Sequence, residues 1–151
     1  MNAKEYVETI LAPMVARYLA EPAAKDLGFA ACILAFHSVD YAAKDGRFGS
    51  KSNFEAKLRD FNADFEIVHA LATAAKHTLV NDRRLQHVGL QEEDAIISSA
   101  AAFSDGAYFS DGSSWADMPQ AIQVKTPDGI FHDLTFILPR LLENIYSLVR
   151  S

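Results

Sequence analysis

The chain has 151 residues, of which 50% are hydrophobic and 23% charged, and its formal net charge is −6. This length is enough for one domain with a core that needs no disulfide or metal, and the composition excludes a largely disordered chain. The single cysteine, Cys32, excludes an internal disulfide, and the acidic balance argues against broad binding of duplex DNA through a basic surface. The longest apolar run, residues 27–36, is about half of the roughly 20 residues that cross a bilayer. We therefore expect a cytoplasmic protein without a membrane partner.

Alanine content and hydrophobic spacing predict a helical first half, because 17 of the 24 alanines precede residue 81. A first helix is expected to begin after Asn2, where Glu5 completes a capping-box pattern, and Pro13 should kink or split it. A second helix is expected to open at Glu21 and run to about Lys44. Its residues 27–36 are apolar on every side, which is typical of a central, buried helix.

Two shorter helices follow in this prediction. Ser52 and Glu55 form another capping-box pattern, which predicts a helix through about Phe61. A longer helix then covers residues 65 to about 80, whereas residues 81–93 have no clear period.

The last third predicts a small β layer. Residues 95–103 form a candidate strand, and two copies of Phe-Ser-Asp-Gly, at residues 103–106 and 109–112, are typical of turns. The clearest hairpin spans residues 120–132, with Pro-Asp-Gly at residues 127–129 as its turn.

A final helix is expected to follow this hairpin. Asp133 is its predicted cap, apolar residues recur every three or four positions after it, and Pro139 either kinks the helix or marks its start. The predicted fold is therefore mainly α: an antiparallel bundle of four to five helices, with a β-hairpin insertion at about residues 94–132 before the last helix. All of it belongs to one domain, residues 1–151.

Two arcs of polar residues are the first candidates for chemistry. On a helical wheel, Asp40, Tyr41 and Lys44 lie within about 60° of His37. The helix at residues 65–80 carries its own polar arc, which consists of Glu66, His69, Thr73, Lys76 and His77. If the two arcs face each other, they form a cleft of titratable groups in which a histidine can act as an acid or a base. In the alternative, the second arc is an ordinary solvated face, and His37 is satisfied by a carbonyl or by Asp40.

Other motifs are weaker. Arg83 and Arg84 are the only local basic cluster; they can meet a phosphate or an RNA backbone, or be an exposed segment after a helix. Glu66 and His69 match the Glu-x-x-His spacing of di-iron bundles, but only one copy exists where two are needed. We therefore expect no metal and no cofactor, and a metal-binding bundle is kept as a further alternative. The familiar nucleophile and phosphate-loop motifs are absent from the sequence. Their absence weakens the case for an enzyme without excluding one, because catalytic residues need not be close in sequence.

Two segments together resemble a known family. Residues 35–41, Ala-Phe-His-Ser-Val-Asp-Tyr, and residues 72–77, Ala-Thr-Ala-Ala-Lys-His, are similar to the paired helices of bacterial and phage proteins related to the HEPN superfamily. The resemblance covers residues 27–44 and 54–80, a span of about 55 residues. It implies a helical bundle that dimerises. It also implies a role as a binding or regulatory module, or as a metal-independent ribonuclease of toxin–antitoxin or phage-defence systems.

In the ribonucleases of that superfamily, four to six residues separate an arginine from the histidine that follows it. Here Arg83 and Arg84 precede His87 by fewer residues, so the sequence favours a binding or regulatory module, with a homodimer and a protein or RNA partner expected. The alternative is a metal-independent ribonuclease or nucleotide-processing enzyme. Its general acid or base would be His37 or His77, while Lys76 would stabilise phosphate charge and Asp40 would orient an imidazole.

Overall fold

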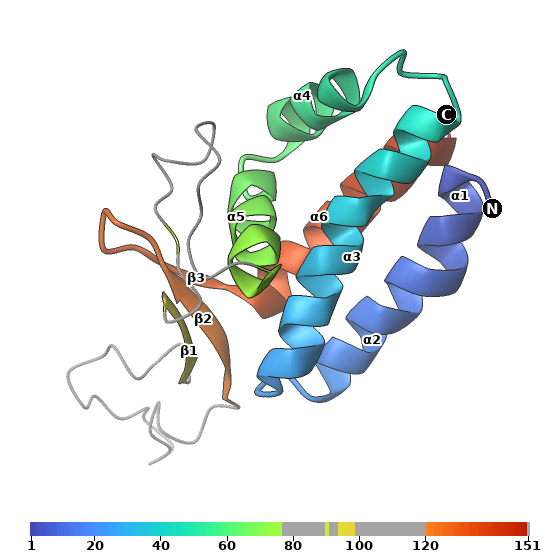
Figure 1. The fold of residues 1–151 in the computed structure, drawn as a ribbon. Helices are drawn as coiled ribbons and strands as arrows, with labels where there is room; N and C mark the ends of the chain where they lie inside the picture. The colour runs from blue at the N-terminus through green and yellow to red at the C-terminus, as the bar shows by residue number, and fades with distance from the viewer. Residues whose placement is uncertain (77–89, 91–93, 99–119, 151) are drawn as a thin grey trace, which may run out of the picture.

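Five helices and a three-stranded antiparallel sheet form the part of the chain that the computed structural model describes, which is residues 1–76, 90, 94–98 and 120–150 (Figure 1). The sheet precedes the last helix, as the sequence predicted. The mainly α fold class is thereby confirmed.

The first helix is continuous through α1 (Ala3–Tyr6), η1 (Val7–Leu11) and α2 (Ala12–Ala20). Asn2 Oδ1 accepts a hydrogen bond from Glu5 N at 2.8 Å and the Glu5 carboxylate accepts from Asn2 N, so the predicted capping box is present. Pro13 was expected to kink or split this helix, and the structure shows that it does not split it. The turn before it, η1, is a π-helix in which Ala12 N donates to Val7 O, and a wider turn accommodates a proline without breaking the helix.

The helix α3 (Lys25–Lys44) begins four residues later than predicted. Residues 21–24 form a turn instead, in which Ala24 N donates to Glu21 O at 2.9 Å. The carbonyl of Pro22 accepts a hydrogen bond from Ile122 N at 3.1 Å, so this turn bonds to the sheet rather than starting the helix.

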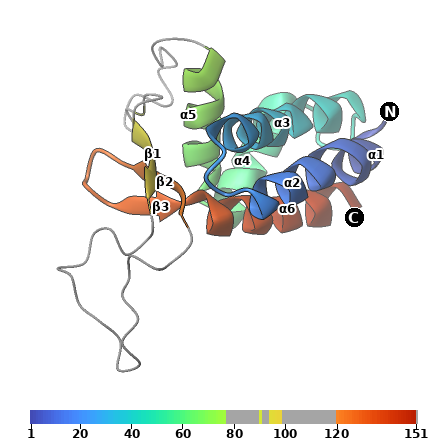
Figure 2. The same ribbon diagram turned by 90° about the horizontal axis from the view of Figure 1, so that it is seen from below.

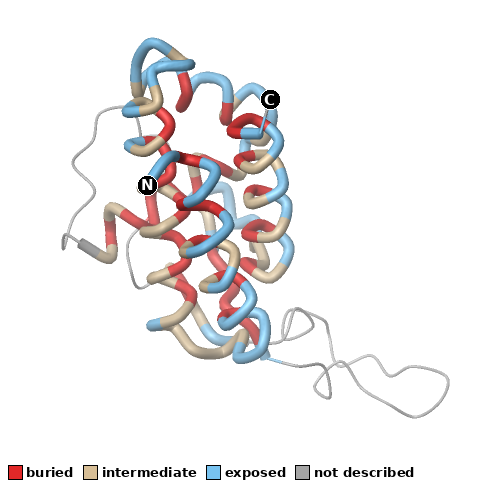
Figure 3. Tube along the Cα trace, turned by 90° about the vertical axis from the view of Figure 1, so that its right-hand side faces the viewer, coloured by how far each residue is buried: buried red, intermediate tan, exposed pale blue. Residues whose placement is uncertain are grey.

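The prediction that residues 27–36 form the central element is confirmed. No residue of this segment is exposed, and α3 contacts every other helix of the described chain. Its buried side is lined with small residues, which let neighbouring helices approach closely: Gly28, Ala31, Cys32, Ala35, Ser38 and Ala42. Figure 3 shows buried positions recurring along the helices between less buried ones, as expected for helices around one core.

The helix α4 (Lys51–Phe61) is capped by a different serine from the predicted one. Ser50 is in an extended conformation and its Oγ accepts from Asn53 N at 3.2 Å, whereas Ser52 already lies inside the helix. The next helix, α5 (Phe65–Lys76), lies beside α3 on the side of the molecule that carries the sheet (Figure 2).

The sheet consists of β1 (Ala95–Ser98), β2 (Ala121–Lys125) and β3 (Phe131–Asp133), in the order β1-β2-β3. Val124 on the central strand pairs with Ala95 on one side and with His132 on the other. The predicted hairpin between β2 and β3 is confirmed. Gly129 in its turn has a φ of +83°, a conformation that favours glycine.

The last helix, α6 (Leu134–Arg150), follows the sheet directly. Asp133 Oδ1 accepts from Thr135 N at 2.7 Å, so the predicted cap is present, and Pro139 lies inside the helix rather than at its start. Among the described residues, none of the helices has both the length and the apolar character needed to cross a bilayer.

Several sequence predictions lie outside the described residues. They are the end of the fourth predicted helix beyond Lys76, the strand beyond Ser98, both Phe-Ser-Asp-Gly copies, and the candidate site residues His77, Arg83 and Arg84.

Candidate functional site

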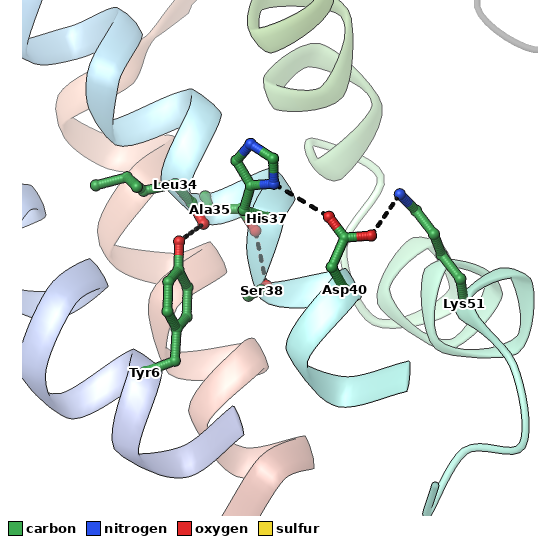
Figure 4. Close-up of polar contacts among 7 residues, drawn as sticks. All are labelled: Tyr6, Leu34, Ala35, His37, Ser38, Asp40 and Lys51. Carbon is green, nitrogen blue, oxygen red and sulfur yellow. Dashed lines mark hydrogen bonds and ion pairs between the residues drawn. The ribbon is translucent and has the colours of Figure 1, made fainter. Parts of the chain in front are cut away.

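A three-residue polar network joins α3 to the start of α4. His37 Nδ1 lies 3.0 Å from Asp40 Oδ2, and Lys51 Nζ donates to Asp40 Oδ1 at 2.8 Å (Figure 4). The three side chains are between 41% and 45% exposed, so solvent and ligands can reach them. Because residues three apart share a helix face, the His37–Asp40 contact follows from the sequence of α3 alone.

The position of Lys51 depends on the turn between α3 and α4. This turn brings the first residue of α4 back over α3, where Lys51 Nζ also lies 4.9 Å from the centre of the Phe36 ring. A cation placed over an aromatic face is held by the negative potential of the ring. Sequence reasoning missed Lys51, because no periodic pattern links it to a residue on another helix.

Asp40 is ionised at neutral pH. Burial alone would raise the pKa of its carboxyl, but hydrogen bonds from Lys51 and His37, together with their charges, outweigh burial and lower the pKa below its ordinary value. An ionised carboxylate only accepts hydrogen bonds, so His37 Nδ1 must carry a proton. In the neutral imidazole the basic nitrogen is then Nε2, on the side of the ring away from Asp40.

A shallow hollow of about 260 Å³ adjoins this network. It is lined by Asp40, Tyr41 and Lys44, which are three of the four residues that the helical wheel placed on one arc. The Tyr41 ring stacks on that of Tyr6 with centroids 4.1 Å apart. Tyr6 is itself anchored, because its hydroxyl donates to Leu34 O at 2.9 Å (Figure 4).

The described members of the second predicted arc, Glu66, His69 and Thr73, do not line this hollow. His69 is only 2% exposed and its ring stacks on Phe36 at 4.0 Å, inside the α3–α5 contact. Glu66 instead approaches Arg59 Nε at 3.4 Å, and Thr73 Oγ1 donates to His69 O at 2.9 Å. His69 therefore lies in the core between α3 and α5 and not on a polar face of α5. Almost every side of α5 is covered, so a polar residue on it does not mark a solvated face.

The described structure thus brings together His37, Asp40, Tyr41 and Lys44 and adds Lys51, whereas Glu66, His69 and Thr73 do not line the same hollow. Lys76 is the last residue of α5, and its side chain is not among those that the structure describes. The assembled groups offer one oriented imidazole, two ammonium groups and one carboxylate on the outer face of α3.

The described part of the chain contains no candidate metal site. Nowhere in it do three or more His, Cys, Asp or Glu side chains lie close enough together to hold an ion. The Glu-x-x-His pair does not converge, because the Glu66 carboxylate approaches Arg59 while His69 packs between Phe36 and Phe65. Burial raises the pKa of the Cys32 thiol to about 12, so this cysteine is a core residue without nucleophilic character.

Comparison of the chain with known protein families, with curated proteins and with solved structures returned no match.

Proposed function

We propose that this chain is a HEPN-like helical binding module, and that the outer face of α3 together with the start of α4 binds the phosphate groups of RNA. The observation that carries the proposal is the network of His37, Asp40 and Lys51. It holds an imidazole and an ammonium group in fixed positions at the surface, next to the hollow lined by Lys44.

The local charge supports an anionic ligand. The proposed surface carries two lysines, Lys44 and Lys51, against the single carboxylate of Asp40, a balance of +1 in a chain whose net charge is −6. A basic surface on an acidic protein concentrates positive potential at one place, which steers phosphate groups toward it. Tyr41, next to these cations, offers an aromatic ring of the kind on which unpaired bases stack.

The test is binding of a fluorescently labelled single-stranded RNA, measured by anisotropy over a range of salt concentrations. Lys44→Met and Lys51→Met should each weaken binding and lower the salt slope by about 0.7, the value for one lost phosphate contact on a single strand. Arg17→Gln is the matched control, because it removes one exposed positive charge from α2, away from the proposed surface. The proposal is overturned if the unmodified protein does not bind RNA at low salt, or if all three variants behave alike.

The geometry at His37 supports a second candidate function, a metal-independent ribonuclease. The Asp40 carboxylate fixes the Nδ1–H tautomer, as a general base requires. In this reaction His37 Nε2 takes the proton of a ribose 2′-hydroxyl, whose oxygen bonds to the adjacent phosphorus. The bond from phosphorus to the 5′-oxygen then breaks, and a second group, for which His77 is the candidate, gives that oxygen a proton. The products are a 2′,3′-cyclic phosphate and a 5′-hydroxyl end.

Cleavage of RNA in the presence of a chelator distinguishes this candidate. We expect loss of cleavage in both His37→Ala and His77→Ala. Equal cleavage by the unmodified protein and the double variant would refute it.

The homodimer that the resemblance implies stays a prediction. Light scattering coupled to gel filtration tests it, and a monodisperse monomer over the micromolar range would contradict it.

A further inference from the structure

A second hollow lies where the sheet meets the first turns of α6. Its volume is about 410 Å³, within the range of small-ligand pockets, and its lining includes Gln123, Phe131, Asp133, Phe136 and Arg140. None of these residues belongs to the surface proposed above. The combination of aromatic rings, an amide and a guanidinium group restricts what such a hollow can hold.

Phe136 is the most exposed large hydrophobic side chain of the described chain, at 68%. It lies on the first turn of α6, and the neighbouring ring of Phe131 on β3 lines the same hollow. An open aromatic face at the edge of a pocket is a surface on which planar rings stack.

Gln123 lines the hollow with a hydrogen-bonding group that is held in place. The residue is 2% exposed, and its Nε2 donates to Asp133 Oδ2 at 2.8 Å. Asp133 is in turn held by Thr135, whose N and Oγ1 lie 2.7 and 2.6 Å from Oδ1. This chain of contacts determines which side of the amide is nitrogen and which is oxygen.

The orientation of Gln123 has a chemical consequence. Oε1 is an acceptor to which no described residue donates, and Nε2 keeps one further hydrogen besides the one that Asp133 accepts. An acceptor next to a donor complements the amino group and ring nitrogen of adenine, the pairing that glutamine makes with this base elsewhere.

Arg140 supplies the positive charge among the groups that line the hollow. It is largely exposed, and one of its nitrogens lies 3.1 Å from Asp64 Oδ2 on the residue before α5. A guanidinium group has five donor hydrogens, so this ion pair leaves several that can bind phosphate.

From these contacts we propose that the hollow between β3 and α6 binds an adenine nucleotide, with the base stacked on Phe136, its amino edge on Gln123 and its phosphate on Arg140. The ligand is either a free nucleotide or one residue of an RNA chain, since both present the same base and phosphate.

Isothermal titration calorimetry with AMP, adenosine, CMP, inorganic phosphate and a short oligoadenylate tests the proposal. We expect AMP to bind more tightly than CMP, and adenosine to lose the contribution of the phosphate. The α3–α4 surface can also bind oligoadenylate, so oligoadenylate binding without AMP binding supports this pocket, with RNA as the source, if Phe136→Ala weakens it and Lys51→Met does not, and contradicts this pocket if the reverse is found. Binding of neither overturns the proposal, as does equal affinity for AMP, CMP and phosphate.

Three variants locate the site. Phe136→Ala should weaken AMP binding about 5- to 150-fold, the range for loss of one stacking ring, and its exposure leaves the fold unaffected. Arg140→Gln should weaken AMP but not adenosine. Ile130→Ala, an exposed apolar residue in the β2–β3 turn that does not line the hollow, is the matched control and should change nothing.

Two further outcomes separate this proposal from others. Lys51→Met should leave AMP binding unchanged, because Lys51 does not line this hollow. The nucleotide proposal can therefore hold even if the α3–α4 surface does not bind RNA. If Phe136→Ala changes the oligomeric state while no nucleotide binds, the ring is a contact between copies of the chain and the nucleotide proposal is wrong.

Discussion

Gly28, in the first turn of α3, lies against Ile122 on the central strand of the sheet, and its substitution tests how closely these two elements pack. A Cβ at this position would lie 2.4 Å from Ile122 Cδ1 and 3.2 Å from Tyr18 Cε2. Both neighbours are fully buried, so neither can turn into solvent to make room.

Two opposing effects determine the stability of Gly28→Ala. Alanine favours the helix by about 1 kcal/mol over glycine, whereas forcing an extra methyl group into a packed core costs about 1–3 kcal/mol. We therefore expect a net loss of about 0–2 kcal/mol in the free energy of unfolding. Ile122→Val removes the Cδ1 atom that the new methyl group would meet, at its own cost of about 0.5–1.5 kcal/mol.

The decisive quantity is the coupling between the two substitutions, measured by urea denaturation of the unmodified protein, both single variants and the double variant. With Cδ1 removed, Gly28→Ala should become neutral or stabilising, which gives a coupling of about 1–3 kcal/mol. Purely additive effects would refute the close contact of α3 with β2. They would also show that the glycine is not required by the packing.

Three further predictions concern single residues. Ser50→Ala should destabilise the protein by about 1 kcal/mol in chemical denaturation, while Ser52→Ala should have almost no effect, because only Ser50 caps α4; the reverse order would restore the capping box expected from the sequence. Cys32 should react with a thiol reagent only at the rate at which the protein unfolds, since burial raises its pKa to about 12, and rapid labelling of the native protein at pH 8 would contradict this. Asp40→Asn should cost less than about 1 kcal/mol at pH 7, because the ion pairs with Lys51 and His37 are partly exposed. Since the pKa of Asp40 is lowered in the folded state, its contribution is present above the ordinary aspartate value of about 3.9 and is lost as the pH falls below it, so the difference between the two proteins should disappear in denaturation curves at low pH.

Local patterns in the sequence were sufficient to predict most of the elements. The capping box at Asn2, the apolar run in α3, the hairpin turn at Gly129 and the cap at Asp133 each involve residues only a few positions apart. Such interactions form within one turn of chain, so the sequence order contains all the information they require. The grouping of His37, Asp40, Tyr41 and Lys44 on one face of α3 was predictable for the same reason.

Tertiary packing determined the rest. His69 was expected on a polar surface, yet it stacks on Phe36, because α5 is covered on nearly all sides and a helical wheel does not record how many neighbours a helix has. Lys51 reaches Asp40 only through the turn between α3 and α4, and Gln123 meets Arg140 in one hollow only because α6 folds back against the sheet. By itself, the sequence determined the helices, the hairpin and the outward face of α3, since these depend on neighbours along the chain. The partners of that face and the hollow beside the sheet depend on contacts between distant segments, and only the folded structure brings those segments together.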